Sequence, residues 1–144
     1  MSYEFCALDG LVVVRWGKIP ELLDVERYAK EISDARVKQN KSLVGLFIMP
    51  PESAPPDEAF RKAQARKLPA IMQNLSYAVA VFEGSGFIAC LKRSALVAIL
   101  LLAPKKYSIH VRSSVEEALV SNPAGPIEFN AKLTLVEMKR RNLC

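Results

Sequence analysis

The chain has 144 residues, of which 51% are hydrophobic, so it can bury one core and is short for two domains. Its formal net charge of +5 is compatible with an acidic partner, a nucleic acid or a membrane surface, and is specific for none of them. Three widely spaced cysteines, Cys6, Cys90 and Cys144, contain no CxxC pair, which argues against a zinc site and a disulfide framework.

The N-terminal residues and the most apolar stretch bear on where the protein resides. Met1–Phe5 lacks the basic start and apolar core of a signal peptide, so we expect a cytoplasmic protein with reduced thiols. The stretch Ala95–Ala103 is about half of the roughly 20 residues that a membrane-spanning helix needs. We expect it to be a buried helix instead.

Two short strands open the chain, and a helix follows them. Tyr3–Leu8 and Leu11–Trp16 are rich in β-branched and aromatic residues, and the dipeptide Asp9-Gly10 between them suits the tight turn of a β-hairpin. From Pro20 to about Asn40, apolar residues recur at helical spacing with charged residues between them. This pattern predicts an amphipathic helix.

A central strand and a proline-rich loop come next. Leu43–Met49 is apolar throughout and too short for a free-standing helix, so it is predicted to be a strand covered on both faces. Residues 50–57 contain four of the nine prolines and are expected to form a surface loop. Asp57 can cap the next helix, which should extend to about Met72 with a kink or an early stop at Pro69.

The second half of the chain repeats this alternation. Ser76–Phe82 predicts a strand, and a glycine-rich turn separates it from a helix that runs from Phe87 to about Ala103. Tyr107–Val111 predicts the last strand, and a serine after it can cap a short helix. We therefore expect an α/β fold with a mixed sheet, helices covering the sheet and the element order ββαβαβαβα.

A second cluster of helix breakers, Asn122–Pro126, separates a C-terminal tail from the rest of the chain. On this basis we divide the chain into a domain of residues 1–122 and a tail of residues 123–144. Apolar spacing in Ile127–Arg141 favours a helix, although part of it also alternates as in a strand. The tail can pack on its own domain, on a second copy in a homodimer, or on anionic lipid.

The order of elements resembles that of the STAS domain, and specifically of its SpoIIAA-like branch, over residues 3–121. The local pieces that carry the resemblance are Gly86-Phe87 at a helix start, Lys92–Leu96, His110-Val111, and Ser114–Leu119. The resemblance implies a bacterial regulatory or scaffolding module that binds a protein partner and is not an enzyme. It also implies an alternative, since that branch is related to lipid carriers of the CRAL-TRIO type: a protein that binds a small apolar ligand or a lipid.

In the antagonists of this family, the contact surface is the start of the second helix, and a phosphorylatable Ser or Thr follows the third strand in an Asp-Ser-x-Gly type motif. The loop after Met49 lacks that Asp and Gly, and Ser53 is its only hydroxyl residue. Two alternatives remain for Ser53: it is a regulatory residue, or it is an ordinary loop serine exposed to solvent.

A protein partner would meet this loop and the basic flank of the helix behind it. The candidate partner-binding residues are Ser53, Asp57, Arg61, Lys62 and Arg66. The three basic residues recur at spacings that place them, with Lys67, on one flank of a helix. A solvated helix face would explain the same residues without a partner.

Two further features, a glycine-rich turn and a histidine, are candidates for a binding or catalytic site. Gly84, Ser85 and Gly86 open a helix and could bind an anion, or could simply allow a tight helix start, because they lack the wider dinucleotide fingerprint. His110 lies in a predicted strand with no nucleophile or acid at readable spacing. We therefore predict no catalytic, cofactor-binding or metal-binding residue. We expect no nucleic-acid recognition either, because the sequence has no basic stripe with exposed aromatic residues.

Overall fold

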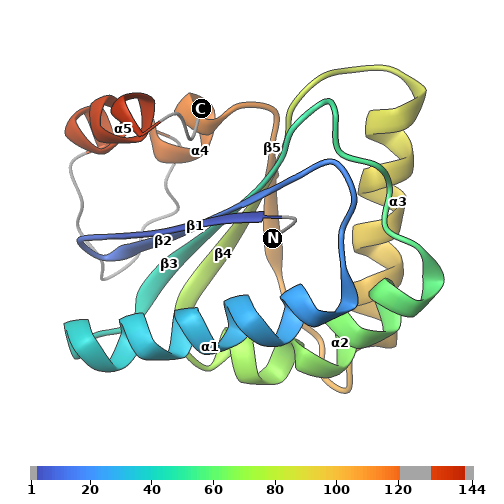
Figure 1. Ribbon diagram of the computed structural model, residues 1–144, viewed down its shortest axis with the longest axis horizontal. Helices are drawn as coiled ribbons and strands as arrows, with labels where there is room; N and C mark the ends of the chain where they lie inside the picture. The colour runs from blue at the N-terminus through green and yellow to red at the C-terminus, as the bar shows by residue number, and fades with distance from the viewer. Residues whose placement is uncertain (1–2, 121–130, 142–144) are drawn as a thin grey trace.

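The computed structural model describes residues 3–120 and 131–141. Its strands form a five-stranded sheet in which spatial order follows sequence order (Figure 1). The strands are β1 (Tyr3–Leu8), β2 (Leu11–Trp16), β3 (Leu43–Met49), β4 (Leu75–Phe82) and β5 (Ile109–Arg112). β1 pairs antiparallel with β2, and each later pair is parallel, so the predicted α/β fold with a mixed sheet is confirmed.

Helices cover both faces of the sheet. They are α1 (Leu22–Gln39), α2 (Glu58–Met72), α3 (Phe87–Leu102), α4 (Val115–Val120) and α5 (Ala131–Arg140). The three connections from β2 to β5 all advance in the same direction across the sheet. Because such parallel crossovers are right-handed, α1, α2 and α3 must share one face. Figure 1 shows α4 and α5 on the opposite side from α1 and α2.

Alternation along β2 divides the core into two clusters. Val12, Val14 and Trp16 pack with residues of α1 and α2, whereas Leu11 and Val13 pack with residues of α4 and α5. This is the alternation expected of a strand whose successive side chains point to opposite faces. Both faces of the sheet are therefore buried, as the continuous apolar runs in the sequence predict.

The first cluster contains a group of aromatic side chains that surrounds Trp16. The ring of Trp16 lies 5.2 Å from that of Tyr28 and 5.3 Å from that of Phe60, both in edge-to-face geometry. This arrangement is the favoured one for aromatic pairs. It fixes the indole at the end of β2, next to the cavity described below.

Some boundaries differ from those that the sequence predicts. Pro69 does not stop α2, which continues to Met72, and β5 begins at Ile109 instead of Tyr107. α5 occupies residues 131–140 of the predicted helix, while its expected first residues and the breaker cluster lie outside the described residues. α5 packs against α4 and buries Met138 in the second cluster. In the described part of the chain, no helix is long and apolar enough to cross a bilayer.

Candidate ligand-binding cavity

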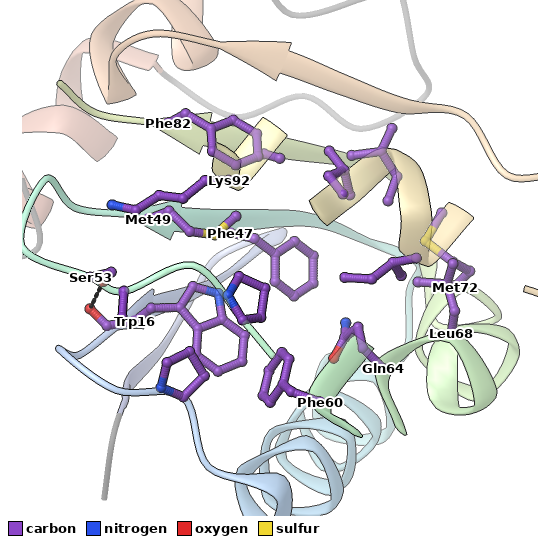
Figure 2. A pocket seen from close by; sticks show the side chains of 17 residues that line it. Trp16, Phe47, Met49, Ser53, Phe60, Gln64, Leu68, Met72, Phe82 and Lys92 are labelled. Carbon is purple, nitrogen blue, oxygen red and sulfur yellow. Dashed lines mark hydrogen bonds between the residues drawn. The ribbon is translucent and has the colours of Figure 1, made fainter. Parts of the chain in front are cut away.

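A cavity lies between the sheet and the two helices α2 and α3, at the carboxyl ends of β2, β3 and β4. About 80 Å³ of it is open to the centres of water-sized molecules. Phe47, Met49, Ala80 and Phe82 form its sheet side, and further lining residues come from both helices and the proline-rich loop (Figure 2). Ligands of open parallel sheets bind near this end of the strands, which makes the cavity the candidate site.

On the sheet side of the cavity, Ala80 has the smallest side chain. It points into the cavity from β4, whereas the alternate residues Val79 and Val81 point to the opposite face. From α3, the longer side chains of Lys92, Leu96 and Ile99 line the cavity. Protein interiors are normally packed to crystal-like density, so the short side chain of Ala80 leaves space that a larger residue would fill.

Three polar side chains line the cavity: Ser53, Gln64 and Lys92. The Lys92 side chain comes from α3 and is only 3% exposed, and its Nζ donates hydrogen bonds to the carbonyl oxygens of Pro50 at 2.8 Å and Pro51 at 3.3 Å. Burial lowers the pKa of Lys92, and the nearby Glu52 carboxylate partly opposes this effect. Lys92 thus ties the helix above the cavity to the loop after β3.

The same loop is also tied to the end of β2. The Ser53 hydroxyl donates to the carbonyl oxygen of Gly17 at 2.6 Å, and the Ala54 amide donates to that of Lys18 at 2.7 Å. Ser53 is 2% exposed, so the expectation of a solvated loop serine is wrong. Because its hydroxyl is buried and bonded within the chain, the structure does not present Ser53 to a partner.

The other candidate partner-binding residues lie on α2 beside this loop. Asp57 caps the helix, since its Oδ1 accepts a hydrogen bond from the Phe60 amide at 2.8 Å. Lys62 pairs with Glu58 of the same helix at 2.7 Å. Arg61 and Arg66 have no carboxylate within ion-pair distance in the part of the chain that the structure describes. The basic flank predicted from the spacing is therefore present on α2, and Glu58 neutralises part of its charge.

The glycine-rich turn before α3 has a conformation that requires glycine. Gly84 and Gly86 have φ angles of 90° and 86°, a region that other residues rarely adopt. Ser85 between them is exposed, and Gly86 is the N-cap residue of α3 without a side-chain capping bond. This geometry accounts for both glycines as a tight helix start, and anion binding at Gly84, Ser85 and Gly86 stays a prediction.

His110 lies on the sheet face opposite the cavity. Its ring meets that of Tyr77 edge-on at 6.0 Å, and the neighbouring residue Ile109 faces the cavity instead. Within residues 3–120 and 131–141, no cluster of three or more histidine, cysteine or acidic residues could hold a metal ion. His110 is therefore placed as a half-buried packing residue at the edge of the sheet.

The outer side of α3 is apolar and exposed, which corrects the expectation that Ala95–Ala103 forms a buried helix. Phe87 is 75% exposed and Leu101 is 81% exposed. The predicted buried stretch Ala95–Ala103 does contribute the buried residues Ala95 and Ile99 to the inner side. It also contains exposed apolar residues, so apolar character alone did not tell the two sides of this helix apart.

Gln64 is a polar site residue that sequence reasoning missed. Gln64 interrupts an apolar stripe of α2 at four-residue spacing, between Phe60 and Leu68, and all three residues line the cavity. That interruption was a readable signal, because a helix face directed at a filled core is normally apolar.

Comparison of the chain with protein-family models, with curated proteins and with solved structures gives no match.

Proposed function

We propose that this protein is a non-enzymatic binding protein that holds a small, mainly apolar molecule in the cavity between the sheet and α3. The observation that carries the proposal is a void of about 80 Å³ lined almost wholly by apolar side chains. An apolar molecule that covers this lining would remove apolar surface from water, which is favourable.

The size of the cavity limits the ligand. One water needs about 10–15 Å³ measured in this way, so the cavity has room for roughly five to eight waters. That space corresponds to a single ring or a short alkyl chain. The proposal is therefore narrower than the lipid carrier implied by the family resemblance, because a long-chain lipid would require α3 to move away from the sheet.

The polar groups at the cavity support binding without catalysis. The Ser53 hydroxyl and the Lys92 ammonium are both engaged by backbone carbonyl oxygens, at 2.6 Å and 2.8 Å. Among the described residues that line the cavity, none is acidic. A general acid–base pair or an activated nucleophile would need such a partner within hydrogen-bond reach.

A second candidate function is docking of an acidic protein partner by a STAS-like, SpoIIAA-like module. The observation behind this proposal is the α/β fold, in which the strands of a mixed sheet follow one another in sequence order. Arg61 and Arg66, on the flank beside the loop that Ser53 and Lys92 hold in place, would supply charges complementary to the partner. Replacing both arginines by glutamate should abolish partner capture and leave ligand binding in the cavity unchanged.

Toluene is the probe that tests the cavity, because it is apolar and consists of a single ring. Toluene should raise the melting temperature of the wild-type protein, because a ligand that binds only the folded state stabilises it. The Ala80→Leu variant fills the cavity and should lose this response. Ala59→Leu makes the same chemical change on the exposed side of α2 and should keep it.

Circular dichroism would establish that both variants are folded, and Leu96→Phe, which fills the cavity from α3, replaces Ala80→Leu if that variant is not. Toluene binding should also appear as saturable shifts of the amide resonances around Phe47 and Leu68. The proposal is overturned if toluene does not stabilise the wild-type protein, or if the filled variants respond as strongly as the wild type does.

A further inference from the structure

We infer that Gln64 selects the ligand, and that the ligand is an uncharged molecule with one ring or a short chain whose apolar body carries a hydroxyl group. This inference rests on the proposed function and adds the chemical class of the ligand. Figure 2 shows the Gln64 amide at the cavity, between Phe60 and Leu68 of the same helix. It is a polar group in the middle of an apolar lining.

The oxygen of the Gln64 amide has no hydrogen-bond partner among the described residues. Its Oε1 is buried and accepts no hydrogen bond from any described residue. A buried acceptor left without a donor costs roughly 1–3 kcal/mol, so such groups are normally paired. A ligand hydroxyl that donates to Oε1 would supply the missing bond.

The other two polar side chains at the cavity are already engaged. The Ser53 hydroxyl donates to Gly17, and the Lys92 ammonium donates to Pro50 and Pro51 at the loop. Of the three polar side chains, Gln64 is thus the one with a buried oxygen that has no hydrogen-bond partner in the described part of the chain.

The lining also indicates that the ligand carries no charge. A buried ion is costly unless an opposite charge lies beside it. Among the lining residues Lys92 is the one that ionises, and its ammonium is held against the loop carbonyls. A hydroxyl group avoids this cost, and it pairs with a neutral amide. The surrounding rings of Trp16, Phe47 and Phe60 suit a flat apolar body.

The test compares p-cresol with toluene, which differ by one hydroxyl group, and measures both dissociation constants by calorimetry. The variant Gln64→Leu keeps a side chain of similar size and removes its hydrogen bonding. We expect the ratio of the toluene to the p-cresol dissociation constant to fall by about tenfold or more in Gln64→Leu, because the cresol hydroxyl is then buried without a partner. Gln73→Leu makes the same change at an exposed position at the end of α2 and should leave the ratio unchanged.

The outcomes separate this inference from the proposed function. If neither compound binds the wild-type protein, the proposed function fails, and this inference fails with it. If toluene binds but Gln64→Leu leaves the ratio unchanged, or weakens both compounds equally, the role of Gln64 is refuted and the cavity remains a binding site. Gln64→Met serves as the second variant if Gln64→Leu does not fold.

Discussion

On one face of the sheet, Leu46 and Ile48 of β3 are buried in the cluster formed with α4 and α5; on the other, Phe47 and Met49 of the same strand border a cavity. The two faces differ in the side chains that meet across them: the cavity is lined by Ser53, Gln64 and Lys92 besides apolar residues, whereas the other cluster is apolar. The difference shows that burial on both faces of a strand does not imply equally dense packing on both. Four predictions can break or sharpen this comparison.

The largest expected effect comes from a matched pair of leucines, Leu46 and Leu68, which are both 2% exposed. Leu46 packs on the filled face, so Leu46→Ala should lower the free energy of unfolding by about 3–4 kcal/mol. Leu68 already borders empty space and has fewer contacts to lose, so Leu68→Ala should cost about 2 kcal/mol. Urea denaturation measures both. Equal losses would show that the two faces are packed alike.

An intermediate effect on stability is expected from the hydrogen bonds by which Lys92 of α3 holds the loop after β3. Lys92→Met keeps the apolar stem and removes both hydrogen bonds to Pro50 and Pro51, but it also relieves the burial of a charge. We expect a net loss of about 1 kcal/mol in the free energy of unfolding and faster hydrogen exchange of the Ala54 amide. Lys105→Met, at an exposed position, is the control.

The same variant has a pH signature. Because folding lowers the pKa of Lys92 below its ordinary value of 10.5, the unfolded chain binds this proton more tightly than the folded one. Wild-type stability should therefore rise relative to Lys92→Met as the pH increases from the lowered pKa to 10.5. A difference that stays constant with pH would contradict the burial of this ammonium.

The smallest effect is expected on the filled face, at α5. Hydrogen bonds from Arg140 and Arg141 lower the pKa of Glu137 from 4.5 to about 2. The ionised Glu137 carboxylate therefore stabilises the folded state fully above pH 4.5, and this contribution is lost as the pH falls to about 2. Stability measured against pH should show this loss in the wild type and not in Glu137→Gln. High salt should weaken the stabilisation by Glu137, since its ion pairs with Arg140 and Arg141 lie at the surface. A difference in stability between the wild type and Glu137→Gln that does not depend on salt would be evidence against these ion pairs.

Periodicity and turn chemistry predicted the elements well. The hairpin at Asp9-Gly10, the buried strand Leu43–Met49 and the capping role of Asp57 all follow from local rules, and the structure has each of them. Such patterns report which face of an element is buried. They do not report whether the side chains of two facing elements fill the space between them, which is why the cavity was not predicted.

Ser53 and Lys92 show the same limit for single residues. Ser53 stands in a proline-rich loop expected at the surface, and Lys92 is a residue type that normally faces water. Both are buried, and distant backbone carbonyls accept their hydrogen bonds. Those acceptors come from the end of β2 and from the loop after β3, 36 and 42 residues away in the chain. No local pattern contains that information.

The connections from β2 to β5 all advance in the same direction across the sheet, and this affects how a ligand would reach the cavity. α3 is the last helix of its layer; it packs against α2 and β4, and its outer side exposes Leu91, Val97 and Leu101. Segments with few buried neighbours open at lower free energy than the domain unfolds. Uptake and release would then be timed by the opening of α3, so the residence time of a guest molecule should shorten in variants that loosen this helix and leave global stability unchanged.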